Sequence, residues 1–381
     1  MAAAFVLVAY LAGVAPACAR VAASPRIAAT FAPARSGYRF AFPRDHASHP
    51  AYQTEWWYYT GHVRGASGRR FGYELTFFRI GLHPGDVPPT RGQSRWRGNQ
   101  LFPAHFALTD ERGGAFHHYE RFAREALGMG SARTTSLDVR AADWWLRGTV
   151  SAHARDREAM RMSAGDSAAG GRDAIDFEQI PDKPPAIHGR DGVSKKAGCA
   201  TCASHYYSYT RLRTSGTLTY RGERMRVDGI SWMDHEFGSG ELQSDQAGWD
   251  WFSIQLDDRR ELMLYVLRKK DGTVTPESSG SVVERDGTVN HLERKAFDVA
   301  PTGTWKSPHT GATYPSGWRV RVPSARVDVV LAPTVADQEL AAGPNEVSYW
   351  EGAVDVRAVG SGTPLGTGYV ELTGYAGSVS F

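Results

Sequence analysis

The chain has 381 residues, which is more than one compact core usually holds, so we expect two domains. Its net charge of +3 is close to neutral and its basic residues are scattered, which argues against a nucleic-acid-binding protein. Aromatic residues make up 11% of the chain, and 41 Gly and 20 Pro accompany them. This composition predicts an all-β protein with many short strands and turns.

The first segment, residues 2–19, is apolar but shorter than the roughly 20 residues that a membrane span needs. It ends in small residues of the kind found at cleavage sites, so residues 1–19 are predicted to be a signal peptide for periplasmic or secreted export. Residues 20–37 are rich in Ala, Pro and Arg and are predicted to be a linker. No Lys or Arg precedes the apolar run, so the true start of the protein could lie upstream. Lipidation of Cys18 or an uncleaved anchor stays open as an alternative to cleavage.

Regular patterning starts near residues 38–42. The aromatic residues 54–60 follow as a strand, and a turn at residues 65–68 leads to a returning strand at 71–79. This pattern predicts a hairpin. Further strands are expected at the following places: residues 102–109, 115–122, 137–139, 144–154, 174–180, 217–220 and 224–232. The rest of the segment 163–203 is predicted to be a long loop over the mouth of a barrel.

After residue 240 the scheme starts again with a second Trp-led hairpin, residues 248–256 and 261–268. Residues 232–236 and 369–373 also echo each other, because each has an aromatic, an apolar and an acidic residue in turn. This duplication predicts two tandem lipocalin-like antiparallel β-barrels, with domains at residues 38–240 and 241–381. A ligand could bind inside one barrel or in a cleft between the two.

Alternation along a strand decides which side chains share a face. It places Glu55, Trp57 and Tyr59 on one face of the first strand, with Trp56 and Tyr58 on the other. Glu55, Trp57 and Tyr59 are the predicted pocket residues of this strand.

The same rule groups Trp232, Asp234 and Glu236 and sends His235 to the opposite face. An acid between aromatic walls is desolvated, which raises its pKa and lets it hold a proton near neutrality, as acid-catalysed addition to an alkene requires. The alternative is a buried acid that only hydrogen-bonds backbone or Arg. A metal site is disfavoured because His235 points away from the two acids, and we expect no metal and no cofactor.

Cys199 and Cys202 form an isolated CxxC pair. A four-cysteine zinc site is excluded within the chain, and His205 is too far along for a CxxCH haem motif. A local disulfide is expected in an oxidising compartment, with a redox role or half a metal site as alternatives. Just beyond, Tyr206 and Tyr207 can line a pocket with an apolar ring and a polar tip, or simply belong to the core.

Three common nucleotide and hydrolase motifs are missing from the sequence. It contains no GxxxxGK[ST], no GxGxxG after a strand and no GxSxG. ATP binding, dinucleotide chemistry and serine hydrolysis are therefore not expected.

A string of motifs resembles the AttH-like family, which includes carotenoid 1,2-hydratase, also called hydroxyneurosporene synthase. The matching segments are residues 42–46, 49–50, 54–61, 71–79, 206–208, 229–237, 248–252, 349–352 and 368–375. The resemblance implies two lipocalin-like domains with a ligand cavity. It also implies either hydration of an isoprenoid alkene or, as in relatives found beside ABC transporters, an accessory role in export. Fungal relatives resemble pericyclases that shape a polyene.

The first functional hypothesis is an exported enzyme that hydrates an apolar isoprenoid, lipid or polyene ligand. The second is a non-enzymatic periplasmic binder that serves an ABC transporter permease. The sequence predicts no nucleic-acid partner and no particular oligomeric state. The candidate catalytic residues are Asp234, Glu236 and His235. The candidate ligand-binding residues are Glu55, Trp57, Tyr59, Tyr206, Tyr207, Trp232, Trp249 and Trp251.

Overall fold

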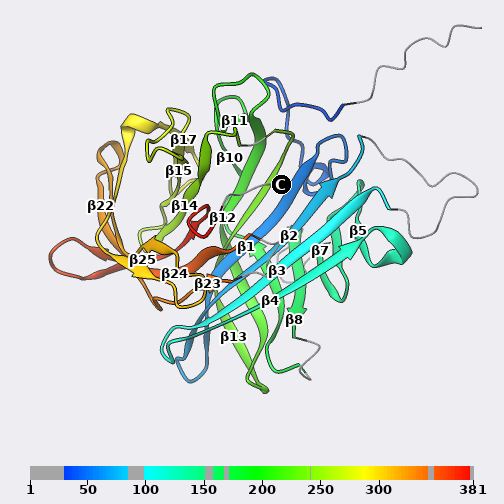
Figure 1. Cartoon of the computed structure of the whole chain (residues 1–381). Coiled ribbons are helices and arrows are strands. Elements are labelled where there is room, and N and C mark those ends of the chain that lie inside the picture. The colour runs from blue at the N-terminus through cyan, green and yellow to red at the C-terminus, as the bar shows by residue number, and fades with distance from the viewer. Residues whose placement is uncertain are drawn as a thin grey trace, which may run out of the picture.

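Two curled antiparallel sheets dominate the computed structural model, which describes residues 30–84, 98–150, 158–166, 171–240, 242–341 and 347–377 (Figure 1). The expectation of an all-β chain with two tandem lipocalin-like barrels is confirmed. The predicted signal peptide, Cys18 and the linker as far as residue 29 lie outside the described residues. Within the described residues, no helix is both long and apolar enough to cross a membrane.

The first sheet takes its strands from Thr54 to Gly238, in the spatial order β4-β3-β2-β1-β13-β12-β9-β8-β7-β6-β5, with β10 and β11 on β12. Its strands are β1 Thr54–Gly65, β2 Arg70–Gly81, β3 Gln100–Asp110, β4 Ala115–Arg124, β5 Gly130–Ala132, β6 Asp138–Ala141, β7 Trp144–Val150, β8 Glu158–Gly165, β9 Ala174–Pro181, β10 Ala186–Ile187, β11 Ser194–Lys195, β12 Ala203–Tyr220 and β13 Glu223–Gly238. The edge strands β4 and β5 touch, so the sheet curls into a barrel.

The second sheet takes its strands from Gln246 to Leu372, in the order β17-β16-β15-β14-β25-β24-β22-β21-β18, with β23 on β24. Its strands are β14 Gln246–Leu256, β15 Glu261–Lys269, β16 Ser279–Val283, β17 Val289–Glu293, β18 Asp298–Pro301, β21 Trp318–Val322, β22 Val327–Pro333, β23 Glu339–Leu340, β24 Tyr349–Ala358 and β25 Pro364–Leu372. A separate pair joins β19 Thr304–Lys306 and β20 Thr313–Pro315. Four single-turn 3-10 helices complete the described residues: η1 Arg44–His46, η2 Ala126–Gly128, η3 Arg294–Ala296 and η4 Pro323–Ala325.

The described part of the segment 163–203 contains two short strands where the sequence predicted a long loop. Its strand at Ala174–Pro181 is present as β9, and the short strands β10 and β11 both pair with β12. Strands of two residues are too short to show a pattern in the sequence. They form here because the long strand β12 supplies their hydrogen-bond partners.

The two sheets repeat one arrangement of strands. In the first, the hairpin β1–β2 lies beside β13; in the second, the hairpin β14–β15 lies beside β25. The predicted echo between residues 232–236 and 369–373 therefore falls on strands that hold corresponding places. The duplication that the sequence predicts is therefore also present in the structure.

Alternation gives each barrel a packed interior and an outer face toward its partner. In β1 and β2, odd-numbered side chains such as Trp57 and Tyr73 fill the first core, whereas Tyr58 faces the second barrel. The second barrel has its own core around Phe252 and Trp318. A third apolar cluster joins the two barrels where β1, β2 and β12 contact β25, β24 and β14. The outer faces thus form the contact between the domains.

Candidate functional site

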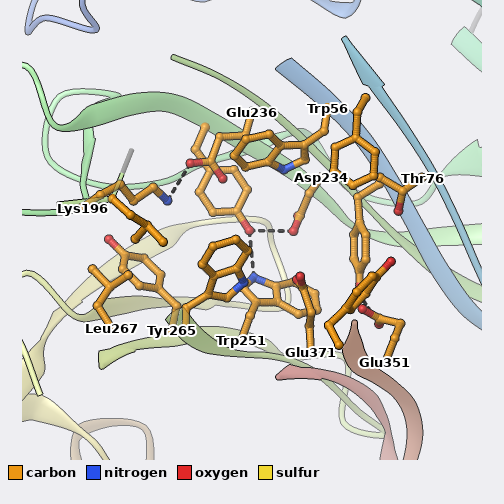
Figure 2. Close-up of a pocket in the computed structure, with 16 residues that line it drawn as sticks. Trp56, Thr76, Lys196, Asp234, Glu236, Trp251, Tyr265, Leu267, Glu351 and Glu371 are labelled. Atoms are coloured by element: carbon orange, nitrogen blue, oxygen red, sulfur yellow. Dashed lines mark hydrogen bonds and ion pairs between the residues drawn. The ribbon is translucent and has the colours of Figure 1, made fainter. Parts of the chain in front are cut away.

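A pocket opens between the two barrels, on the faces of both sheets that point away from their own cores (Figure 2). Its lining from the first barrel comprises Trp56, Tyr58, Thr76, Phe78, Tyr206, Asp234 and Glu236. Its lining from the second barrel comprises Trp249, Trp251, Tyr265, Leu267, Tyr349, Glu351 and Glu371. Lys196 and Leu242 complete it. The walls are therefore mostly aromatic, and carboxyl groups are the main polar feature.

Asp234 on β13 is buried and accepts hydrogen bonds on both carboxyl oxygens. The indole N–H of Trp232 donates to Oδ1 at 2.6 Å, and the hydroxyl of Ser208 donates to the same atom. The hydroxyl of Tyr206 donates to Oδ2 at 2.6 Å and itself accepts the indole N–H of Trp251 at 3.1 Å. These contacts hold the carboxyl group in one orientation at the aromatic wall.

Burial controls the protonation of Asp234. Loss of hydration raises its pKa, the three donors oppose that rise, and the pKa settles at about 7 instead of its ordinary 3.8. The group is therefore present as both acid and carboxylate near neutral pH. Such a carboxyl group can give a proton to a ligand and take one back.

Glu236, two residues along the same face, is in a different environment. The ammonium of Lys196 lies 2.6 Å from its Oε1, and the hydroxyl of Ser204 donates to the same oxygen. The Lys196 ammonium also lies over the ring of Tyr265, 4.8 Å from the centroid. Glu236 is thus held as an ion pair, unlike Asp234.

Two further carboxyl groups, absent from the sequence prediction, enter the pocket from the second barrel. Glu351 on β24 and Glu371 on β25 are direct partners in the antiparallel ladder. Burial raises the pKa of Glu371 to about 7, with the Trp249 side chain lowering it and Asp234 raising it. Burial and the neighbouring Glu371 raise the pKa of Glu351 well above its ordinary value. The motif at residues 369–373 was the sequence signal that could have located Glu371.

The aromatic walls come from the strands that the sequence singled out, but not always from the predicted face. Trp249, Trp251 and Tyr206 line the pocket. Trp232 is not one of the lining residues, but its indole N–H donates to Asp234. In β1 the pocket residues are Trp56 and Tyr58, whereas the sequence pattern predicts their neighbours on the opposite face.

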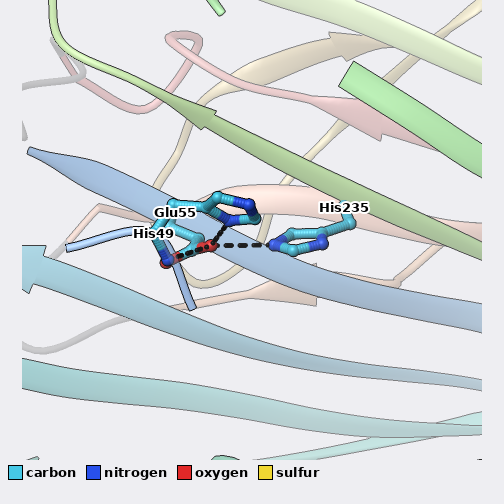
Figure 3. Close-up of side chains that lie close together, drawn as sticks. All are labelled: His49, Glu55 and His235. Carbon is cyan, nitrogen blue, oxygen red and sulfur yellow. Dashed lines mark hydrogen bonds and ion pairs between the residues drawn. The ribbon is translucent and has the colours of Figure 1, made fainter. Parts of the chain in front are cut away.

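The structure places Glu55, Trp57, Tyr59, Tyr207 and His235 on the opposite face of the first sheet, away from this pocket. Trp57, Tyr59 and Tyr207 are part of the first barrel's core. Glu55 and His235 meet there at 2.9 Å, at one end of that core (Figure 3). The physical reason is the two-residue period of a strand, which separates these residues from their even-numbered neighbours.

Glu55 lies at the centre of a second cluster, which also contains His49, Arg79 and His235. Its Oε1 lies 2.7 Å from Nδ1 of His49 and 2.9 Å from Nε2 of His235, and its Oε2 accepts the guanidinium N–H of Arg79 at 2.7 Å. Burial opposes ionisation, but Arg79 and both imidazoles lower the pKa of Glu55 well below its usual range. Burial lowers the pKa of His235 to about 4, so it is neutral.

Among the residues that the structure describes, one group could hold a metal ion: His49, Glu55 and His235, whose ligand atoms lie within 4.8 Å of one another. The buried Arg79 already supplies a positive charge to the shared carboxylate. A divalent cation would face that guanidinium, which disfavours its binding. The cluster is better described as a hydrogen-bonded anchor for the segment around His49.

Cys199 and Cys202 form a disulfide, with their Cα atoms 5.3 Å apart. It lies in the loop between β11 and β12, where the backbone N–H of Lys196 donates to the carbonyl of Cys202 at 2.9 Å. The loop that carries the disulfide thus begins at the pocket's lysine.

The geometry defines a two-barrel β protein with an aromatic, carboxyl-lined pocket between its domains, and comparison with known proteins places it in a family. The family model described as AttH-like matches residues 33–375. An AttH crystal structure from Nitrosomonas europaea is 31% identical, with a TM-score of 0.78, and the match covers 91% of this chain and 100% of that one. The chain belongs to the AttH-like family.

A second solved structure shares the fold at lower identity. Kievitone hydratase from Nectria haematococca is 16% identical, with a TM-score of 0.63, and the match covers 91% of this chain and 98% of that one. No curated protein sequence matches the chain.

Proposed function

We propose that this protein binds an apolar, isoprenoid-type ligand between its two barrels and adds water across one of the ligand's double bonds. The observation that carries the proposal is Asp234, a buried acid in an aromatic pocket whose pKa of about 7 leaves it protonated in part at neutral pH. An alkene is a weak base, so its protonation requires a well-placed acid from which water is excluded.

In the proposed reaction, the Asp234 proton forms a bond to the less substituted alkene carbon. The tertiary cation that results is stabilised by the faces of the pocket's aromatic rings, each by about 0.5–2 kcal/mol. Trp56, Trp249 and Trp251 are placed for this role. The position of the Lys196 ammonium over Tyr265 illustrates how a ring face in this pocket accommodates positive charge. Water then adds to the cation.

The disulfide supports a protein that works outside the cytoplasm. Disulfides persist in oxidising compartments, and the Cys199–Cys202 bridge suits the predicted export. The hydratase with the same fold indicates that two barrels of this kind can accommodate water addition. Carotenoid-like, lipid and polyene ligands all fit the proposed chemistry.

The test uses heavy-oxygen water. The purified protein is incubated in H2¹⁸O with isoprenoid alkenes and with an apolar extract of its host, and products are analysed by mass spectrometry. Gain of one H2¹⁸O by a ligand, absent with Asp234→Asn, is expected. Recovery of bound but chemically unchanged lipid would instead favour the non-enzymatic accessory of an ABC permease.

A further inference from the structure

The internal duplication has a consequence for the pocket. Aligning the repeated motifs places Trp232 against Tyr369 and Asp234 against Glu371. Their strands, β13 and β25, hold corresponding places, each beside the first hairpin of its own sheet. Because the two barrels meet through these faces, the two corresponding acids enter one pocket from opposite walls (Figure 2).

The surroundings of Glu371 suit an ionisable group that acts on water. It is partly exposed, into the pocket, and its direct neighbours across the ladders are Trp251 and Glu351. The side chain of Trp249 hydrogen-bonds to it. Burial and the charge of Asp234 both make it a better base than an ordinary glutamate.

The other two pocket glutamates are less free to act. Glu236 is ion-paired with Lys196 at 2.6 Å. Glu351 is fully buried, and its Oε1 accepts the hydroxyl of Tyr58 at 2.7 Å. Glu371 is therefore the carboxyl group of the second barrel that is best placed to meet a water molecule.

We propose that Glu371 is the general base that takes a proton from the attacking water, opposite Asp234 as the general acid. This inference rests on the proposed hydration. The Asp234 O–H bond breaks as the alkene's electron pair forms a C–H bond. The water oxygen then forms a C–O bond to the cation, and its proton passes to the Glu371 carboxylate. The net change is addition of one water, after which Asp234 regains and Glu371 releases a proton to solvent.

Two isotope measurements on the same reaction separate the roles. Geraniol, farnesol and squalene serve as probes, first in H2¹⁸O to follow water addition and then in D2O to follow deuterium in the recovered alkene. In D2O the Asp234 carboxyl group carries deuterium, which it adds to the alkene carbon. Deuterium stays in the recovered alkene when the cation then returns a protium from that carbon to the Asp234 carboxylate, so this exchange needs Asp234 but not the base. Water addition needs both Asp234 and the base Glu371.

Glu371→Gln is expected to lower ¹⁸O addition by about 100-fold or more while deuterium exchange stays close to the wild-type rate. Asp234→Asn is expected to lose both. Glu371→Asp, which keeps a carboxylate at a greater distance, should regain part of the addition. Glu223→Gln, an exposed exchange of the same kind, is the control and should change neither.

Equal loss of addition and exchange in Glu371→Gln, or full retention of addition, would overturn the base assignment while leaving the hydratase proposal intact. If wild type shows neither isotope in any probe, the hydration of this ligand class fails and the inference fails with it. Should Glu371→Gln not fold, Glu371→Asp decides: addition lowered more than exchange supports the role, and equal lowering contradicts it.

Discussion

Replacing Asp234 by Asn tests the centre of the proposed site, because Asn matches the shape of the protonated acid but cannot supply its proton. Its amide oxygen can still accept from Trp232 and Ser208, and its amide nitrogen can donate to the hydroxyl of Tyr206. We therefore expect turnover to fall by about 10²–10⁴-fold with the fold and ligand affinity retained.

The same substitution should change how the free energy of unfolding depends on pH. The pKa of Asp234 is about 7 in the folded protein and 3.8 ordinarily, so the folded state binds the proton more tightly. Its stabilising contribution is complete below about pH 4 and is lost as the pH rises to about 7. At about 1.4 kcal/mol for each unit of pKa difference, this loss amounts to about 4 kcal/mol. Asn has no such dependence.

Denaturant unfolding of wild type and Asp234→Asn at about pH 4 and about pH 8 measures this difference. At the lower pH the two proteins should have similar free energies of unfolding, within the roughly 1 kcal/mol of one rearranged hydrogen bond. At the higher pH the variant should be the more stable by up to about 4 kcal/mol. A stability difference that does not change with pH would refute the buried-acid argument, and retained turnover would refute the catalytic role.

Three further predictions concern the groups around this acid. Tyr206→Phe removes a donor that favours the carboxylate, so the pKa of Asp234 should rise and the alkaline limb of the pH–rate profile should move to higher pH. Glu236→Gln removes the negative charge that lies 2.6 Å from the Lys196 ammonium, and a loss of about 2 kcal/mol in unfolding free energy is expected at neutral pH, with Glu223→Gln as the unchanged control. Cys199 and Cys202 should resist thiol labelling in exported protein until a reductant is added, and full labelling without reductant would contradict the exported disulfide.

Much of the fold was accessible from the sequence because its signals are local. The Trp-led hairpins, the turn positions and the two-residue period of apolar side chains all depend on neighbours in the chain. The curling of each sheet is not local: it needs the last long strand, β13 or β25, to return beside the first. Only the echo between residues 232–236 and 369–373 hinted at that pairing.

The site was harder to predict because alternation sorts residues into two faces without saying which face is the interior. The sequence predicts one pocket-lining face on each strand. On β13 the predicted face, with Asp234, does line the pocket, whereas on β1 the predicted face, with Trp57, belongs to the core. Both faces of these strands are aromatic and buried, one inside the barrel and the other between barrels. Composition therefore could not separate them.

That second buried face also explains why the acids gather between the domains. Each barrel interior is filled mainly by large apolar side chains such as Trp57 and Trp318, and Glu55 meets its partners at one end of the first core. At the contact between the barrels, tyrosine hydroxyls and indole N–H groups supply donors while their rings keep bulk water away. Asp234 and Glu371 thus lose enough hydration to titrate near neutrality and are still held in position. A duplicated barrel supplies one such acid from each copy, which is what a reaction that both gives and takes a proton requires.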